Sequence, residues 1–106
     1  MVVFDFSSLA TLSAVDDLQK CLEEIKGDIS ILVNNVGNFQ MTRFKDMSIS
    51  QCLALINVNV NSQLFVSKLL LPRLSQHRSL VVNISSSQIL RPNPFLNVYG
   101  ATKTFN

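Results

Sequence analysis

The sequence predicts an α/β protein in which a parallel β-sheet is flanked by helices on both faces. Two observations support this prediction. Short apolar runs, rich in β-branched residues, alternate along the chain with longer segments whose apolar residues recur every three or four positions, as expected of amphipathic helices. The short runs in the middle and later parts of the chain are unbroken, which is typical of parallel strands buried on both faces.

The composition is that of a small globular protein. The chain has 106 residues, of which 47% are hydrophobic and 15% charged, so it is long enough for one small domain. Its net charge is only +2 and it has no basic block, so nucleic-acid binding is not expected. No segment approaches the roughly 18 apolar residues of a membrane span. The N-terminal MVVFDFSS does not resemble a secretory leader, and we expect a protein that is not secreted.

The two cysteines, Cys21 and Cys52, lie in segments that the sequence predicts to be helical. Neither has a second Cys or a His at the spacing of a metal site. We therefore expect two buried, reduced thiols, with no disulfide and no bound metal.

The first part of the chain predicts strand, helix, strand. Residues 2–6 predict a short strand that ends at an acid, Asp5. Residues 13–26 have apolar residues at helical spacing, with Ser13 as a cap and Gly27 as a stop. Residues 29–33 predict a buried strand, which the polar NNVGN ends.

The second part predicts helix, strand, helix. Ser48 is a typical N-cap for a long helix over roughly residues 49–71, which Pro72 and the polar SQHR end. Its middle, LINVNVNS, alternates Val with Asn like a strand, but a helix is favoured because one stripe carries apolar residues at helical spacing: Leu53, Ile56, Val60 and Leu64. Residues 80–84 predict the third strand, and a last helix begins near Asn97.

Polar residues follow each predicted strand. They are Asp5, then Asn34 and Asn35, then residues 85–87, which are all serine. The carboxyl ends of parallel strands meet at one edge of a sheet, and ligands bind there. Each polar end by itself is typical of a turn or a cap, but the three together predict a binding site.

Tyr99 and Lys103 form the strongest candidate for acid–base chemistry. Residues four apart share one helix face, and a neighbouring ammonium lowers the pKa of a tyrosine from about 10, which suits a general acid or base. Ser86, thirteen residues before Tyr99, can donate a hydrogen bond to a substrate carbonyl. The one histidine, His77, lies in a polar stretch and is expected to be solvated, so a serine-nucleophile triad is disfavoured.

Four motifs in order, NNVG after a strand, NVNS within a helix, NISS, and Tyr-x-x-x-Lys, resemble the short-chain dehydrogenase/reductase family. The resemblance implies a Rossmann-type doubly wound parallel sheet, and hydride transfer between a nicotinamide cofactor and a carbonyl or alcohol. It implies that Asn59, Ser86, Tyr99 and Lys103 are catalytic. It also implies that the cofactor is contacted by a larger set: Asp5, Asn34, Asn35, Gly37, Tyr99 and Lys103.

Further details are similar to one branch of the family, that of 17β-hydroxysteroid dehydrogenases and very-long-chain 3-oxoacyl-CoA reductases. They are the Val in LVNNVG, the prolines Pro92 and Pro94, and the segment YGATKTF. This resemblance implies a lipid-like substrate, NADP(H) rather than NAD(H), and the endoplasmic reticulum. A sugar or other small alcohol is the alternative substrate, and the cytoplasm the alternative location. Four apolar residues on the long helix are compatible with a homodimer and equally compatible with packing on the sheet: Leu64, Phe65, Leu69 and Leu70.

The sequence departs from the family in three respects. Gln88 and Ile89 stand where many members have a glycine, and we expect the family's last strands and substrate-covering segment to be absent because only three residues follow Lys103. The third respect concerns the glycines. Its three glycines, Gly27, Gly37 and Gly100, do not form the Gly-rich turn that binds the pyrophosphate. We therefore expect residues 1–106 to be a partial domain that holds the third, fourth and fifth strands of the family's sheet. The first predicted strand then has no native neighbour, and we expect the chain alone to be marginally stable and inactive.

Two principal hypotheses therefore remain. The first is an NAD(P)-dependent oxidoreductase, here as a truncated chain. The second is a catalytically inactive remnant or splice fragment of such an enzyme. An unrelated α/β binding module is a third, which would require the four motifs to match by coincidence.

Overall fold

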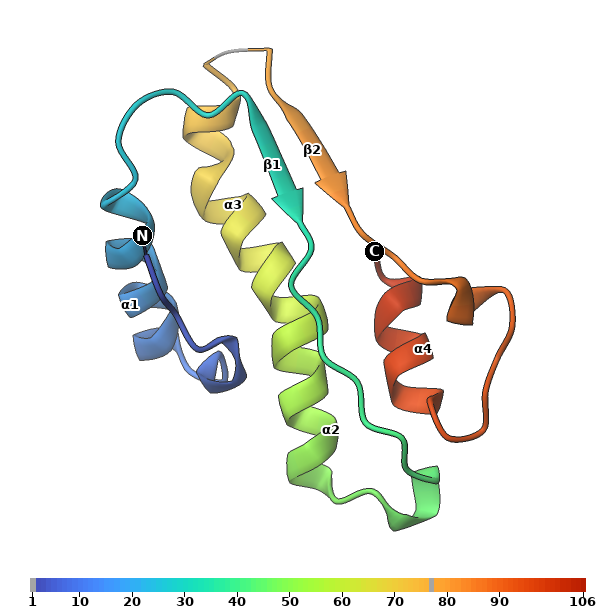
Figure 1. Cartoon of the computed structure of the whole chain (residues 1–106). Helices are drawn as coiled ribbons and strands as arrows, with labels where there is room; N and C mark the ends of the chain where they lie inside the picture. The colour runs from blue at the N-terminus through green and yellow to red at the C-terminus, as the bar shows by residue number, and fades with distance from the viewer. Residues whose placement is uncertain (1, 77) are drawn as a thin grey trace.

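The computed structural model describes residues 2–76 and 78–106, and His77 lies outside the described residues. Helices and strands alternate along most of the chain (Figure 1), in the order α1 (Leu12–Glu23), β1 (Ile31–Asn34), α2 (Ile49–Ile56), α3 (Ser62–Leu74), β2 (Leu80–Asn83) and α4 (Asn97–Thr104). A π-helical turn, Asn57–Asn61, joins α2 and α3 into one long helix. The strands β1 and β2 are parallel, with Ile31 opposite Leu80.

The predicted strand over residues 2–6 is wrong. Residues 2–5 have no regular structure, and Phe6–Ser8 form a 3-10 turn. Asp5 caps that turn, because its Oδ1 accepts hydrogen bonds from the Ser7 amide at 2.9 Å and the Ser7 hydroxyl at 2.8 Å. A strand needs a neighbour to pair with, and among the described residues the sheet consists of β1 and β2 alone.

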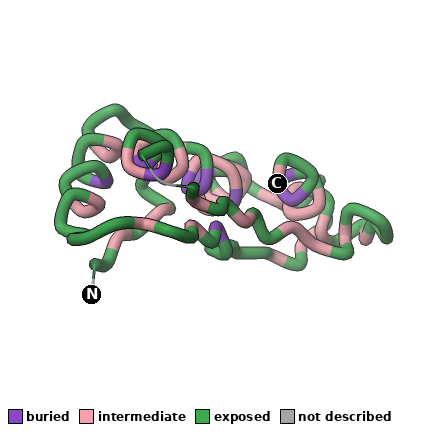
Figure 2. Tube along the Cα trace, turned by 90° about the horizontal axis from the view of Figure 1, so that it is seen from above, coloured by how far each residue is buried: buried purple, intermediate pink, exposed green. Residues whose placement is uncertain are grey.

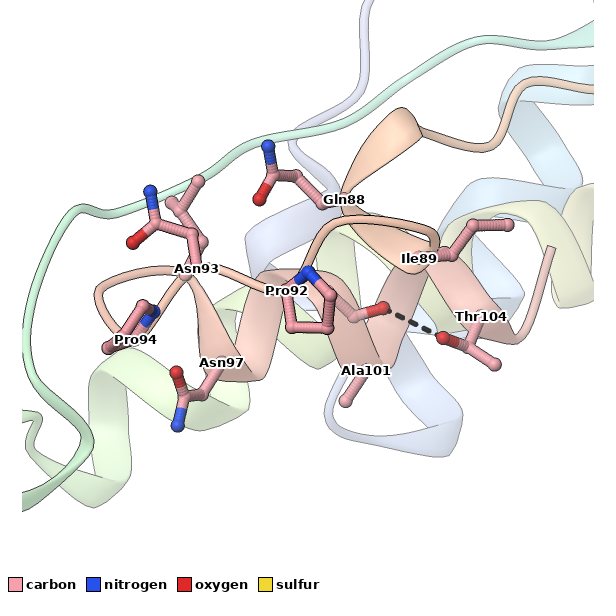
Figure 3. Close-up of a pocket in the computed structure, with 10 residues that line it drawn as sticks. Gln88, Ile89, Pro92, Asn93, Pro94, Asn97, Ala101 and Thr104 are labelled. Atoms are coloured by element: carbon pink, nitrogen blue, oxygen red, sulfur yellow. Dashed lines mark hydrogen bonds between the residues drawn. The ribbon is translucent and has the colours of Figure 1, made fainter.

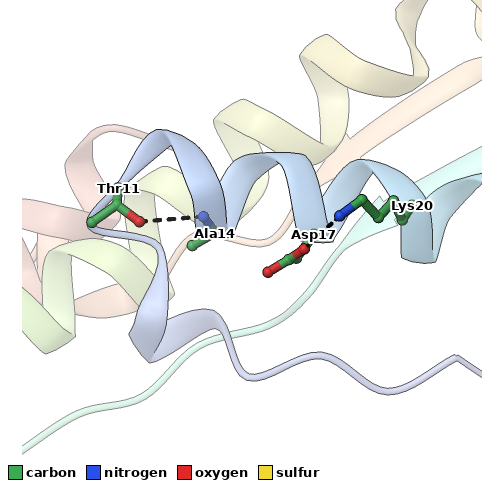
Figure 4. Close-up of polar contacts among 4 residues, drawn as sticks. All are labelled: Thr11, Ala14, Asp17 and Lys20. Atoms are coloured by element: carbon green, nitrogen blue, oxygen red, sulfur yellow. Dashed lines mark hydrogen bonds and ion pairs between the residues drawn. The ribbon is translucent and has the colours of Figure 1, made fainter.

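The first helix is confirmed, but both of its predicted ends are shifted. Thr11, not Ser13, is the cap: its Oγ1 accepts a hydrogen bond from the Ala14 amide at 3.2 Å (Figure 4). The helix ends at Glu23 rather than at Gly27. Gly27 lies in the connection to β1 with a φ of 82°, a conformation that favours glycine.

An exposed ion pair supports α1 one turn further on. Lys20 Nζ lies 2.9 Å from Asp17 Oδ1 (Figure 4), and this hydrogen bond raises the pKa of Lys20 above its ordinary value. The pair's contribution to stability is therefore present below the unfolded-state pKa of Lys20, and it is lost as the pH rises through the raised value.

The strands predicted at residues 29–33 and 80–84 are confirmed as β1 and β2. The prediction that they are buried on both faces is wrong. Asn34 is buried toward the long helix, where its Nδ2 donates to Ser67 Oγ at 3.0 Å and to Asn83 Oδ1 at 2.8 Å. Ile31 and Val33 point to the other face, where they are 60% and 53% exposed. Successive side chains of a strand point to opposite faces, so one face of this sheet is packed and the other is open.

The long helix begins as predicted. Ser48 and Gln51 form a capping box: Ser48 Oγ accepts from the Gln51 amide, and the Gln51 side chain accepts from the Ser48 amide. The helix continues past Pro72 to Leu74, so its predicted end is wrong. Pro72 removes one backbone donor, but Leu70 and Leu74 are buried, and their packing holds the last turn in place.

The apolar stripe that predicted the long helix faces outward. Leu53 and Leu64 are exposed, and Ile56 is partly exposed. The inward face combines buried leucines with buried polar residues: Leu55, Asn57, Asn59, Ser62, Gln63, Leu70 and Leu74. The middle of the helix can bury polar groups because they are hydrogen-bonded, as the next subsection describes.

The core is small. The fully buried apolar residues are Leu9, Leu18, Leu55, Leu70 and Leu74, and most buried positions belong to the helices (Figure 2). The accessible surface is 7137 Å², against about 5,900 Å² for a compact protein of this mass. The radius of gyration is 15.0 Å, against about 13 Å. These residues are therefore less compact than a complete domain of the same length.

Two smaller predictions have different outcomes. Cys21 and Cys52 are free thiols on helices, but they are half-buried rather than buried, because the small core leaves these helix faces partly uncovered. Among the described residues, no helix combines the length and the hydrophobicity that a membrane crossing requires.

Candidate active site

Gly37, in the loop after β1, closely approaches two of the predicted catalytic side chains. A Cβ at this position would lie 3.3 Å from Lys103 Nζ and 3.5 Å from Asn59 Oδ1. The first distance is shorter than most real Cβ contacts, so any larger residue would displace the lysine. The structure therefore brings Gly37, Asn59 and Lys103 together, as the sequence predicts.

Asn59 lies on the π-helical turn and is the most deeply buried polar residue of the site, 1% exposed. Its Oδ1 accepts a hydrogen bond from the Asn38 amide at 2.7 Å, and its Nδ2 donates to the Asn38 carbonyl at 2.8 Å. The same Nδ2 donates to Thr102 Oγ1 on α4 at 2.9 Å. One amide thus fastens the loop after β1 to both the long helix and α4.

The π-helical turn also explains the alternation of Val with Asn. The Ser62 amide donates to the Asn57 carbonyl, five residues earlier, which is the hydrogen bond of a π-helix. Asn57 and Asn61 turn toward the N-terminal segment, where their Nδ2 atoms donate to the carbonyls of Ser7 and Leu9 at 3.1 and 3.5 Å. Asn59 turns toward Asn38 and α4, so the asparagines serve two different neighbours.

Lys103 is only 4% exposed. Its Nζ donates to the Ile84 carbonyl, at the end of the segment that contains β2, at 2.8 Å. Ser85 Oγ donates to the Lys103 carbonyl at 2.7 Å, which holds α4 against the same segment. No carboxylate pairs with Lys103 among the described residues. An ammonium has three donors, so Lys103 retains hydrogen-bonding capacity for a ligand.

Tyr99 lies in the first turn of α4, one helical turn before Lys103. Its ring contacts Phe39 edge-on, with 6.0 Å between the ring centroids. Within the described part of the chain the Tyr99 hydroxyl has no hydrogen-bond partner, so the expected effect of Lys103 on this hydroxyl stays a prediction. The hydroxyl is free to bond a ligand.

Ser86 lies beside α4. It caps a 3-10 turn, Ser87–Ile89, by accepting a hydrogen bond from the Gln88 amide at 3.3 Å. This turn packs on α4, where the Gln88 carbonyl lies 3.9 Å from the Cβ position of Gly100. The Ser86 hydroxyl uses only its acceptor capacity here, so its hydrogen remains available for a substrate oxygen.

Three predicted cofactor residues are not joined to this group. Asp5 lies in the N-terminal segment, on the other side of the long helix from α4 (Figure 1); hydrogen bonds from Ser7 lower the pKa of its carboxyl. Asn34 links β1, β2 and α3. Asn35 is exposed, and its side chain makes no hydrogen bond with a described residue. Their predicted contacts with a cofactor stay predictions.

A cavity of about 510 Å³ lies between α4 and the loop before it (Figure 3). It is lined mainly by amides, prolines and small residues, including Gln88, Pro92, Asn93, Asn97, Ala101 and Thr104. None of the four predicted catalytic residues lines it. We therefore place the candidate active site at the group around Gly37, Asn59, Tyr99 and Lys103, and not in this cavity.

Sequence reasoning missed two residues that hold the site together. Thr102 bonds both Asn59 and the Tyr99 carbonyl, and Ser85 bonds the Lys103 carbonyl. Thr102 has one sequence signal: it lies three residues after Tyr99, a spacing at which a hydroxyl reaches back to a helix carbonyl. Ser85 has no signal that separates it from its two serine neighbours.

Residues 1–105 match the family described as short chain dehydrogenases. The chain belongs to this family. The match spans almost the whole chain, so the family that the four motifs predicted is confirmed. Of the residues that carry the motifs, Gly37, Asn59 and Lys103 lie together, at the loop after β1, the π-helical turn and α4.

Among curated short-chain dehydrogenases, the chain is similar to the predicted branch. It is 36% identical over 88 residues to the 17-beta-hydroxysteroid dehydrogenase type 3 of Rattus norvegicus, covering 78% of this chain and 28% of that protein. It is 34% identical over 100 residues to the very-long-chain 3-oxoacyl-CoA reductase-A of Danio rerio, covering 88% of this chain and 31% of that protein. The chain therefore spans about a third of the length of these relatives, or less.

Solved structures confirm the Rossmann-type α/β fold. One is 4-hydroxyisoleucine dehydrogenase complexed with NADH and succinate, with a TM-score of 0.80 and 26% identity, over 96% of this chain and 47% of that chain. Another is a 3-oxoacyl (acyl-carrier-protein) reductase from Agrobacterium tumefaciens with NADP bound, with a TM-score of 0.77 and 27% identity, over 94% of this chain and 38% of that chain. These two relatives thus bind different nicotinamide cofactors.

Proposed function

We propose that the chain is the catalytic part of an NAD(P)-dependent oxidoreductase that interconverts a carbonyl and a secondary alcohol. Tyr99 exchanges a proton with the substrate oxygen, and Ser86 donates a hydrogen bond to that oxygen. Lys103 holds the nicotinamide ribose. Asn59 supports the proton relay. The cofactor, when bound, supplies or accepts the hydride.

The observation that supports this proposal most is the state of Lys103. An ammonium that is 4% exposed and has one backbone acceptor at 2.8 Å is costly to bury. It is kept against Gly37, where a side chain would crowd it, and on the same helix as a tyrosine whose hydroxyl is free. A buried cation with unused donors suits the hydroxyl groups of a ribose.

The finer proposals rest on the relatives and on the exposed surface. Similarity to the steroid dehydrogenase and the 3-oxoacyl-CoA reductase supports a lipid-like substrate of one of these two classes. We also propose a preference for NADP(H), the cofactor bound in one structural relative, and a place at the endoplasmic reticulum. The outward stripe of the long helix supports a homodimer, since it exposes apolar residues along its length: Ile49, Leu53, Ile56, Leu64 and Leu71.

The alternative is a catalytically inactive remnant or splice fragment of such an enzyme. The small core and the open sheet face favour this alternative for the 106 residues by themselves, because the site depends on loops that few buried apolar residues support. The two functions differ in one measurable property, which is whether a nicotinamide cofactor binds.

Cofactor binding can be measured with the chain's own fluorescence. Tyr99 is the single tyrosine, and the chain has no tryptophan, so tyrosine emission reports on the candidate site alone. We expect NADPH to quench this emission saturably, more tightly than NADH, and we expect Lys103→Ala to weaken the binding. Calorimetry on the same samples checks the stoichiometry.

Lys45→Ala is the matched control. It removes a lysine whose side chain is 73% exposed and whose Nζ lies 4.0 Å from Asp46 Oδ1, a loose ion pair at the surface. The change should therefore leave cofactor binding unchanged. If Lys45→Ala and Lys103→Ala weakened NADPH binding equally, the weakening would come from the loss of one positive charge anywhere on the chain. That result would contradict the proposed contact between Lys103 and the ribose. No saturable binding by the unaltered chain would support the inactive fragment.

A further inference from the structure

The hydroxyl of Thr102 connects two of the proposed catalytic residues. Thr102 is 5% exposed and lies on α4 directly before Lys103. Its Oγ1 accepts a hydrogen bond from Asn59 Nδ2 at 2.9 Å and donates one to the Tyr99 carbonyl at 2.7 Å. The chain of contacts therefore runs from the loop at Asn38 through Asn59 and Thr102 to the backbone of Tyr99.

Both of these hydrogen bonds need a hydroxyl. A hydroxyl can accept and donate at the same time, whereas the isosteric side chain of valine can do neither. Without the hydroxyl, Asn59 Nδ2 would keep only its bond to the Asn38 carbonyl. The Tyr99 carbonyl would lose its bond from the side chain three residues later. Unpaired polar groups in a buried site cost free energy, so the local structure would rearrange.

The position of the Tyr99 backbone sets the position of the Tyr99 side chain. The first turn of α4 has no side-chain cap of its own, because Leu96 precedes it. The contact between Thr102 and the Tyr99 carbonyl therefore supplies a side-chain restraint at this end of α4. Because Thr102 also bonds Asn59, this restraint fixes the Tyr99 backbone relative to the π-helical turn and Asn38, and not only relative to the rest of α4.

We propose that Thr102 is a positioning residue, whose hydroxyl holds Tyr99 in register with Asn59 and so orients the proton-exchanging hydroxyl toward the substrate oxygen. This role rests on the function proposed above. It differs from the roles of Tyr99 and Lys103, since Thr102 touches neither substrate nor cofactor and acts through Asn59 and the Tyr99 backbone.

The test compares Thr102→Val with Thr102→Ser, and it measures how well iodide quenches the emission of Tyr99, the single tyrosine. Thr102→Val keeps the shape and removes the hydroxyl, so we expect a larger quenching constant and weaker NADPH binding. Thr102→Ser keeps the hydroxyl, so we expect it to restore both values toward those of the unaltered chain. A purely structural role for the methyl group would give the opposite order.

Thr104→Val is the matched control on the same helix. Thr104 Oγ1 donates to the Gly100 carbonyl at 3.0 Å (Figure 3) but has no bond to Asn59. We expect this variant to behave like the unaltered chain. Equal quenching constants in Thr102→Val and Thr104→Val would overturn the proposal.

A measurement on the unaltered chain covers the case in which Thr102→Val does not fold. The side-chain amide protons of Asn59 should exchange slowly with deuterated water, because both bonds of Nδ2 are made inside the protein. Exchange as fast as that of the exposed Asn35 would overturn the proposal. Quenching and exchange need no cofactor, so their failure is distinguishable from a failure of NADPH to bind.

Discussion

The two sides of the π-helical turn hold their neighbours in different ways. On one side, Asn59 is 1% exposed and makes bonds of 2.7 to 2.9 Å to Asn38 and Thr102. On the other side, Asn57 and Asn61 reach the N-terminal segment through bonds of 3.1 and 3.5 Å. The first side is a buried network of short hydrogen bonds, whereas the second fastens an exposed turn through longer ones.

The difference shows which part of the candidate site the 106 residues build by themselves. Loop, helix and α4 meet at Asn59: the long helix carries its side chain, and Asn38 of the loop and Thr102 of α4 supply the partners for its amide. The N-terminal segment contributes only backbone carbonyls, and its predicted strand has no neighbouring strand to pair with. The part of the candidate site around Asn59 and Thr102 is therefore organised, while Asp5 lies apart in an exposed turn.

The largest effect should come from removing Asn59. Asn59→Ala leaves the Asn38 amide, the Asn38 carbonyl and the Thr102 hydroxyl without their partner, and we expect a loss of about 3 kcal/mol in the free energy of unfolding. Asn57→Ala, the matched change on the other side, should cost about 1 kcal/mol. Urea unfolding followed by circular dichroism measures both. Similar losses in the two variants would contradict the difference between the two sides.

A smaller effect should come from the glycines. Gly37→Ala places a methyl group 3.3 Å from Lys103 Nζ, so we expect weaker NADPH binding and a loss of roughly 1 kcal/mol in stability. Gly27→Ala has open space around it but a φ of 82°, so we expect a similar loss of roughly 1 kcal/mol from backbone strain alone, with NADPH binding unchanged. Calorimetric titration and urea unfolding separate the two. The same binding loss in both variants would mean that Gly37 has no special contact with the site.

The smallest effect should be the pH dependence that Asp5 contributes. Hydrogen bonds from Ser7 lower the pKa of Asp5 below its ordinary value of 3.8. The stability that this carboxylate provides is therefore present above the unfolded-state pKa and is lost as the pH falls through the lowered value. Asp5→Ala should flatten the decline of the urea midpoint in acid. Asp16→Ala is the control, since its carboxylate accepts no hydrogen bond from a described residue. An unchanged acid profile in Asp5→Ala would show that the Asp5 carboxylate contributes nothing to the pH dependence of stability.

Several elements could be predicted because the signals are local. The capping box at Ser48 and Gln51, the apolar runs that become β1 and β2, and the helix that begins at Asn97 depend on residues close in sequence. The group of Gly37, Asn59 and Lys103 could be predicted from motif order. For the capping box, the strands and the helix at Asn97, local propensity and the packed structure agree.

The remaining features depend on partners far away in the sequence. The strand at residues 2–6 has strand composition, but pairing is a property of two segments, and the second is not present among the described residues. The apolar stripe of the long helix faces outward, but its spacing is the same as that of a buried stripe, so spacing alone does not show which face is buried. Thr102 could not be singled out, because its role appears only once Asn59, 43 residues away, lies against it.

The π-helical turn has one further consequence. An α-helix advances by about 100° per residue, so a five-residue turn in place of a four-residue one puts α3 out of phase with α2 by nearly a third of a revolution. Asn59 points toward α4 and Ser67 toward Asn34 of β1 because of that offset. One extra residue in the turn thus lets a continuous helix present α2 and α3 to different partners. A deletion or insertion between Ile56 and Ser62 should therefore disturb the site as much as a substitution there.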